Sequence, residues 1–218
     1  RPPISTLLPY TTLFRSAKAA GFTPFSAGIM DRDWCANIVI NSIMLRFLGR
    51  EKWEALGDAK TSWKDADVVK AVDYIEELIK AGAYPDGVAS MKLGESHSNF
   101  WAPRTKYAMF PMKTFFAGRA FVPVASGGMA PDFPLGIMDF PELKGGKAND
   151  LTYIQIGGSY GVYTGSKNAA KAAELLQCMA ENADIWVAKV KVQTGLKVDI
   201  AKIKDAYLNA MEIGRAHV

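Results

Sequence analysis

The chain has 218 residues, a formal net charge of +4, 49% hydrophobic residues and 22% charged residues. These values are typical of a globular protein and exclude a disordered, collagen-like or coiled-coil chain. Basic and acidic residues alternate, which disfavours a nucleic-acid-binding protein, and no apolar run reaches the about 18 residues of a membrane-spanning helix. Two cysteines, Cys35 and Cys178, are too few for a disulfide scaffold.

The two ends of the chain differ from the rest. Residues 1–16 scatter proline and threonine among leucines without a helical or strand period, and residues 212–218 end abruptly after a helical pattern. Both strings resemble translated sequencing-adaptor DNA. We therefore expect them to be adaptor-like or disordered tails outside the fold, on a fragment that has lost both true ends.

The first half of the chain is predicted to be mostly helical. Aspartates that can cap a helix precede the segment 34–48, and a glycine follows it. A short helix over 51–56 and a strong one over 65–81 come next, because apolar residues recur at helical spacing and Glu76 lies four residues before Lys80. The expected caps, stops and turns are Asp31 or Asp33, Gly49, Gly82 and Pro85-Asp86-Gly87.

Past residue 100, strand signals alternate with helix signals, which predicts an α/β fold. Strands are expected at 107–110, 135–140, 152–156 and 160–164, with an ordered loop region over 111–134. Helices are expected at 166–182, 184–192 and 200–211, the first of them burying Ala172, Leu175, Leu176 and Met179. Residues 90–101 are ambiguous, with a short helix as one interpretation. The polar segment 141–147 is the best candidate for a hinge or boundary.

A G-x-S-x-G match spans residues 157–161, which is the pattern of a hydrolase nucleophile. Such a site requires a strand before the serine, a helix directly after it, and an acid and a histidine further along the chain. Here the following residues favour a strand, and the sole downstream histidine is His217 in the tail. We therefore interpret this segment as a tight glycine-rich turn between two strands.

Glu95 and His97, with Asp86, are weak candidates for a metal site. A zinc site normally needs three or four ligands, and neither a second histidine nor a nearby cysteine accompanies them. No phosphate-binding loop and no dinucleotide-binding glycine pattern occurs either. We expect no metal and no cofactor. A glycosidase pair of acids stays open, because its two members can be distant in the chain.

Aromatic residues in loops are the most informative feature. Trp34 opens a helix, Trp101 precedes a proline, and Phe115 and Phe116 lie close to Arg119. A sugar ring packs its C–H groups on an aromatic face while its hydroxyls take polar partners. The alternative is that each of these rings belongs to an ordinary core.

Five motifs in order make residues 21–199 similar to the C-terminal part of an extracellular solute-binding protein of a carbohydrate ABC importer, related in plan to maltose-binding protein. They are the helix over 65–81 with Gly82-Ala83-Tyr84, the stretch from Phe100 to Lys106-Tyr107-Ala108-Met109, the strand Gly136 to Pro141, the Gly157-Gly158-Ser159 turn through Ser166-Lys167-Asn168, and the loop Gln193-Thr194-Gly195-Leu196-Lys197.

Proteins of this family have two lobes joined by a hinge, and the ligand is trapped when they close. The resemblance implies that residues 17–140 form most of the C-terminal lobe, 141–150 the hinge region, and 151–211 a partial N-terminal lobe with the terminal helices. It also implies a periplasmic or extracellular monomer whose partner is an ABC transporter permease, held at the membrane by that permease or by a lipid anchor. Apolar edges without partners predict that the chain alone is poorly soluble.

The function implied by the resemblance is non-catalytic binding of a small solute, a sugar or oligosaccharide, in the cleft between the lobes. By the same resemblance, aromatic rings stack on the sugar, an arginine donates to its hydroxyls, and the glycine-rich turn faces the cleft. The implied ligand-binding residues are Trp34, Phe115, Phe116, Arg119, Ser159 and Tyr160. Two alternatives stay open: a carbohydrate-active enzyme with the same aromatic loops, or a binding protein for a non-sugar solute such as a polyamine or phosphonate.

Overall fold

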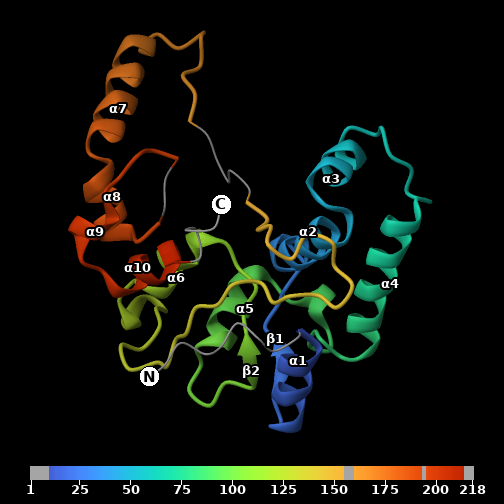
Figure 1. Cartoon of the computed structure of the whole chain (residues 1–218). Helices are drawn as coiled ribbons and strands as arrows, with labels where there is room; N and C mark the ends of the chain where they lie inside the picture. Colours follow the sequence, from blue (N-terminus) through green and yellow to red (C-terminus); the bar gives the residue numbers. More distant parts are fainter. Residues whose placement is uncertain (1–9, 155–159, 193–194, 214–218) are drawn as a thin grey trace.

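The structure is a computed structural model, and it describes residues 10–154, 160–192 and 195–213 (Figure 1). The α-helices are α1 (Tyr10–Ala19), α2 (Trp34–Leu48), α3 (Arg50–Gly57), α4 (Ala66–Lys80), α5 (Leu93–Phe100), α6 (Ala117–Ala120), α7 (Ala169–Glu181), α8 (Ala183–Val190), α9 (Ile200–Ile203) and α10 (Ala206–Ile213). The strands are β1 (Thr23–Phe25) and β2 (Tyr107–Met109), and the 3-10 turns are η1 (Val88–Ser90), η2 (Thr114–Phe116) and η3 (Val124–Ser126).

Helices α2 and α4 lie side by side and carry the largest apolar core. α2 ends at Gly49, whose φ of +76° favours glycine because it has no Cβ. α4 begins after Asp65, whose carboxylate accepts a hydrogen bond from the Asp67 N–H at 2.9 Å. The buried members of this core are Phe14, Phe25, Val39, Ile43, Met44, Phe47, Leu48, Leu56, Val68, Ala71, Leu78, Ala83 and Leu143. Each large apolar side chain buried here stabilises the fold by about 1.5–3 kcal/mol.

The strands β1 and β2 form a parallel pair next to this core. Thr23 lies opposite Tyr107, and Phe25 lies opposite Met109. The Phe25 N–H also donates to the Ala83 carbonyl at 3.0 Å, which joins the pair to the segment after α4. Because parallel strands have their carboxyl ends at the same edge, the loops that follow β1 and β2 start side by side.

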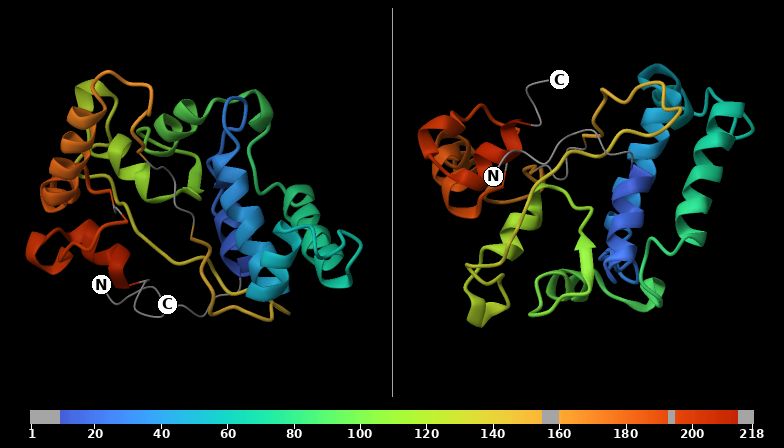
Figure 2. Two further views of the ribbon diagram at one scale, coloured as in Figure 1. Left: turned by 90° about the horizontal axis from the view of Figure 1, so that it is seen from above. Right: turned by 60° about the horizontal axis from the view of Figure 1, so that its bottom comes forward.

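Helices α7–α10 form a second group, set apart from α2–α4 in every view (Figures 1 and 2). Val187, Ile200 and Leu208 make up its small buried core. Phe121, directly after α6, packs edge-on against Tyr207 of α10 with ring centroids 4.9 Å apart. The α7–α10 group therefore contacts the rest of the described chain near α6. Within the described ranges, no helix is both long and apolar enough to cross a bilayer.

The fold begins earlier than the sequence predicts. α1 starts at Tyr10, inside the segment 1–16 expected to be a tail. Phe14 is 5% exposed and joins the core of α2 and α4. Lys18 Nζ donates to the Ala81 carbonyl at 2.7 Å. The expectation is wrong for residues 10–16 because tertiary burial of one aromatic ring can hold a helix that lacks a clear period.

Most strand predictions beyond β2 are also wrong. Residues 135–140 and 160–164 are irregular, as are 152–154, while 155–156 lie outside the described residues. A strand needs a neighbouring strand to satisfy its backbone N–H and C=O groups, and side-chain alternation cannot supply one. In the described part of the chain only β1 and β2 pair with each other.

The helix predictions agree better with the structure than the strand predictions do. α2, α3 and α4 match the expected ranges to within one residue at each end, and the ambiguous segment 90–101 contains α5. The expected helix at 200–211 is divided into α9 and α10. α7 does not have the buried face expected of it: none of its residues is buried, and Leu175 is 60% exposed.

Candidate functional site

The candidate site lies where the loops after β1 and β2 meet. The loop after β1 is held against residues 88–96 by several backbone contacts. The Ile29 N–H donates to the Val88 carbonyl at 3.1 Å, and Ser26 Oγ donates to the Ser96 carbonyl at 2.7 Å. A Cβ on Gly28 would lie 2.5 Å from a neighbouring carbonyl oxygen, so only glycine permits this approach. The loop therefore reaches α2 along a fixed path.

Asp31 completes this loop. Its Oδ1 accepts a hydrogen bond from the Leu93 N–H, at the start of α5, at 2.8 Å. This backbone N–H lowers the pKa of the Asp31 carboxyl. The sequence predicts Asp31 or Asp33 as the cap of α2, but Asp31 binds the start of α5. Asp33 occupies the N-cap position of α2 without a side-chain cap hydrogen bond.

Trp34 and Phe115 form the centre of the site. Trp34 opens α2, Phe115 lies in η2 on the loop after β2, and their ring centroids are 4.6 Å apart in an edge-on arrangement. Both side chains are half-buried, so each presents part of its ring to solvent. The two loops thus bring together aromatic residues that are distant in sequence, as the strand pairing requires.

Charged side chains surround this aromatic pair. The Arg32 guanidinium carbon lies 5.1 Å from the centroid of the Trp34 ring, within cation–π distance. Burial lowers the pKa of the Lys113 ammonium, and the negative charge of Asp33 opposes that shift. The site therefore offers apolar ring surface together with two cationic donors and a carboxylate acceptor. The sequence singled out Asp33 only as a candidate helix cap, and Arg32 and Lys113 not at all. Each of the three lies within two positions of Trp34 or Phe115.

The layer beneath the aromatic pair is apolar. Ala27, Cys35 and Leu93 are buried there, with Met112 packed against them. Burial raises the pKa of the Cys35 thiol, so this cysteine stays protonated and unreactive. The layer supports the site and contributes no chemistry to it.

Phe116 lies elsewhere. It is 7% exposed and packs edge-on against Trp101, Phe110 and Phe100 at centroid distances of 5.7, 5.8 and 6.2 Å. Trp101 is 8% exposed and donates from its indole N–H to the Gly127 carbonyl at 3.2 Å. Ordinary core packing therefore accounts for both rings, and Phe116 is not part of the Trp34–Phe115 pair.

The other expected ligand-binding residues are not gathered at the aromatic pair. Arg119 is exposed on α6, with its guanidinium beside Gly94 of α5. Tyr160 is 77% exposed on an irregular segment. Ser159 lies outside the described residues, as does most of the G-x-S-x-G match.

Glu95 and His97 do not form a metal site. The Glu95 carboxylate is exposed and accepts a hydrogen bond from the Lys92 N–H at 2.9 Å, whereas His97 is buried among aromatic rings. In the parts of the chain that the structure describes, no three His, Cys, Asp or Glu side chains gather closely enough to hold a metal ion.

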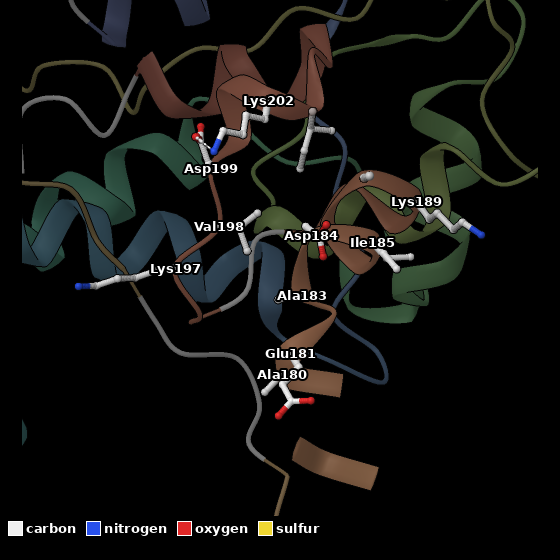
Figure 3. Close-up of a pocket in the computed structure, with 12 residues that line it drawn as sticks. Ala180, Glu181, Ala183, Asp184, Ile185, Lys189, Lys197, Val198, Asp199 and Lys202 are labelled. Atoms are coloured by element: carbon white, nitrogen blue, oxygen red, sulfur yellow. Dashed lines mark ion pairs between the residues drawn. The ribbon is translucent and has the colours of Figure 1, made fainter. Parts of the chain in front are cut away.

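A hollow of about 720 Å³ lies between α8 and the segment that leads into α9 (Figure 3). Its wall includes the small residues Ala180 and Ala183. The Asp199 carboxylate is ion-paired with Lys202 at 3.1 Å, as the figure shows. The hollow depends on how α8 and α9 pack, so no sequence pattern could have predicted it. Its acidic and basic residues balance, and no buried polar atom among the described residues points to a ligand there.

Comparisons with known proteins bear on the fold. No family model matches the chain, and no curated protein sequence matches it. Solved structures do. A chitin oligosaccharide binding protein matches with a TM-score of 0.74 at 18% identity, covering 95% of this chain and 52% of that one.

Two further structures give the same result. One comes from work on xylan utilization by the thermophilic bacterium Caldanaerobius polysaccharolyticus. It has a TM-score of 0.68 at 18% identity, and the match covers 93% of this chain and 51% of that one. The other is the bacterial solute receptor AcbH, whose reported exclusive preference is for β-D-galactopyranose. It has a TM-score of 0.64 at 19% identity, and the match covers 96% of this chain and 53% of that one. The chain spans about half the length of each of these structures. It therefore has the fold of part of a bacterial solute-binding protein, which confirms the fold expected from the sequence resemblance.

Proposed function

We propose that the chain is part of a non-catalytic binding protein that captures a small solute, a sugar or oligosaccharide, for delivery to an ABC transporter permease. The observation that carries the proposal is the Trp34–Phe115 pair at the carboxyl edge of the strands, on a fold shared with sugar-binding receptors. In open α/β folds, ligands bind at this edge.

The chemistry of the pair suits a sugar. The partly exposed rings offer an apolar surface for the C–H groups of a pyranose, and such stacking adds about 0.5–1.5 kcal/mol beyond area burial. Arg32 and Lys113 donate hydrogen bonds to hydroxyl oxygens, and the Asp33 carboxylate accepts them. No proton transfer or bond cleavage is required of these groups.

The wider arrangement follows from the same proposal. Residues 17–140 belong to the C-terminal lobe, and residues 151–211 to part of the other lobe with the terminal helices. The ligand is held between the two lobes. The protein works outside the cytoplasm, as a monomer that meets its permease at the membrane surface. Tyr160 faces the ligand from the second lobe, and Arg119 supplies a further donor.

Binding of defined sugars tests this proposal. We would titrate the chain with chito-oligosaccharides, xylo-oligosaccharides and galactose and measure saturation-transfer NMR and calorimetry. We expect one class of probe to bind, and Trp34→Ala or Phe115→Ala to weaken its binding about tenfold, as loss of stacking and buried area predicts. Trp63→Ala is the matched control, because Trp63 is 68% exposed between α3 and α4.

The outcomes separate the alternatives. If no sugar binds, or if Trp63→Ala weakens binding as much as Trp34→Ala does, the proposed site is wrong. Cleavage of a probe by the unmodified chain would favour the carbohydrate-active enzyme. If a polyamine or a phosphonate binds and no sugar does, the result would favour a binding protein for a non-sugar solute.

A further inference from the structure

The segment 140–150, called the strap here, contains the hinge expected from the sequence, but it is firmly attached to α2. Leu143, in its middle, is 1% exposed and belongs to the core of α2 and α4. Ala148 is 7% exposed. A free linker between two lobes would expose such residues, so these two buried side chains indicate that the strap is attached to the α2–α4 unit.

Arg46 provides the attachment. Its side chain, near the end of α2, is 3% exposed. Nη2 donates to the Phe140 carbonyl at 2.7 Å, and Nη1 donates to the Asn149 carbonyl and, at 3.4 Å, to the Asn149 side-chain oxygen. The guanidinium thus holds the two ends of the strap at once. Its carbon also lies 5.5 Å from the centroid of the Phe140 ring.

The backbone of Arg46 holds the middle of the strap. Its carbonyl oxygen accepts hydrogen bonds from the Lys147 N–H at 2.8 Å and the Ala148 N–H at 3.1 Å. The Lys147 ammonium also forms an ion pair with Asp67 of α4 at 2.7 Å. One residue of α2 therefore contacts the strap through both its side chain and its main chain.

Asn149 closes the strap on itself. Its Oδ1 accepts a hydrogen bond from the Leu143 N–H at 2.9 Å, and its Nδ2 donates to the Leu143 carbonyl at 3.0 Å. These two bonds fix the loop that Arg46 holds.

Carbonyl oxygens satisfy the buried guanidinium, and no carboxylate among the described residues lies within ion-pair distance of it. The negative charges of Glu142, Asp139 and Asp150 favour its charged form from further away. A lysine could not replace it, because a single ammonium lacks the planar fork that reaches Phe140 and Asn149 together.

We propose that Arg46 is a positioning residue that makes the strap a rigid part of the α2–α4 unit, so that the lobes bend outside residues 140–150 when a ligand is captured. The part of this inference that concerns ligand capture rests on the proposed function. The attachment of the strap by Arg46 is tested without a ligand, so it can fail while the proposed function holds, and the reverse is also possible.

The first measurement is amide hydrogen exchange of the unmodified chain. We expect the Lys147 and Ala148 amides, which donate to the Arg46 carbonyl, to exchange at least about tenfold more slowly than those of the exposed residues Val122 and Ala125. Exchange of all these amides at the same rate would overturn the proposal, whether or not any variant folds.

The second measurement is the distance between two spin labels, one on the strap at Lys144→Cys and one at Lys64→Cys before α4, in a Cys178→Ser background. Both labelled positions are exposed, while Cys35 is buried and stays unlabelled. We expect a narrow distance distribution in this parent, and a broad one when Arg46→Met or Arg46→Lys is added.

The matched control is Arg50→Met, which removes an exposed arginine paired with Glu54. We expect it to leave the distribution narrow. Asn149→Ala is a milder second variant, because it removes the two bonds to Leu143 and one long contact with Arg46 but leaves the guanidinium bound to the Phe140 and Asn149 carbonyls. We expect it to broaden the distribution too. A broad distribution in the parent, or a narrow one in both Arg46→Met and Asn149→Ala, would overturn the proposal.

Discussion

His97 makes the stability of this fold depend on pH. The side chain is 1% exposed in α5, and its ring lies 4.8 Å from Phe110 and 5.7 Å from Trp101, measured between centroids. Nδ1 lies 2.8 Å from the Leu93 carbonyl oxygen. Since a carbonyl only accepts, Nδ1 carries the proton of the neutral ring, and Nε2 is left as a buried acceptor without a partner. Protonation would place a charge and a second unpaired donor in this apolar site.

The sign and size of the effect follow from linkage. Burial lowers the pKa of His97 below its ordinary value of 6.5. The hydrogen bond to the Leu93 carbonyl raises this pKa, and the positive charge of Arg119 lowers it, but burial is the largest effect. The unfolded chain therefore binds a proton more readily than the folded one. The contribution of His97 to stability is complete above pH 6.5 and is lost as the pH falls through the unfolded pKa towards the folded one. The loss grows as the pH falls below 6.5 and cannot exceed about 1.4 kcal/mol per pH unit.

Urea unfolding at pH 7.5, 6.5, 5.5 and 5.0, followed by circular dichroism, measures this loss. His97→Phe is the comparison, because it keeps an aromatic ring and removes the titrating group. Any cost of the larger ring is the same at every pH and cancels from the pH dependence. The Asp67 carboxyl does not interfere: its pKa is lowered to about 2, so its own contribution is lost at more acidic pH. If His97→Phe and the parent chain lose equal stability between pH 6.5 and 5.0, the reasoning is refuted.

Three further predictions concern packing. We expect Gly28→Ala to lower the urea midpoint clearly, because its Cβ would lie 2.5 Å from a backbone oxygen. Gly57→Ala is the control and should leave the midpoint unchanged, because the space around Gly57 is open. Equal midpoints for the two variants would contradict the fixed path of the loop after β1. Leu208→Ala should cost about 2–5 kcal/mol of unfolding free energy, because the side chain is fully buried, whereas Leu175→Ala should stay within about 0.5 kcal/mol; similar losses would contradict the packing of α7–α10. Leu175 and Trp186 are 60% and 39% exposed. We therefore expect this chain by itself, in contrast to the whole protein proposed above, to self-associate in size-exclusion chromatography with light scattering, and a monodisperse monomer would disprove this.

Local signals explain why some of the fold could be predicted. α2 and α4 follow from apolar spacing, from Gly49 after one helix and from Asp65 before the other, and all of these lie within the helix or beside it. The predicted strand at 135–140 depends on a neighbour that the described chain does not provide. Phe14 shows the opposite error: its helix has weak local signals and depends on a core formed by distant residues.

The candidate site was only partly predictable for the same reason. Trp34 and Phe115 could be selected as loop aromatics, but only the parallel pairing of β1 and β2 brings them together. Phe115 and Phe116 are adjacent in sequence and identical in chemistry. The turn η2 directs Phe115 towards Trp34 and Phe116 into the aromatic core, and no pattern in the sequence distinguishes the two. Asp31 had the residue type of a helix cap and is one, although for α5 and not for α2.

The parallel pairing of β1 with β2 also has a consequence for synthesis of the chain. Thr23 and Tyr107 are partners that about 80 residues separate, so closing the loop between them costs about 4 kcal/mol of chain entropy before the pair is formed. As this part of the chain leaves the ribosome, α1 and β1 emerge before β2, and α2 and α4 can pack before β2 has been made. Until residue 109 emerges, β1 lacks its partner β2, and this part of the nascent chain is most exposed to mispairing with other strands during this interval.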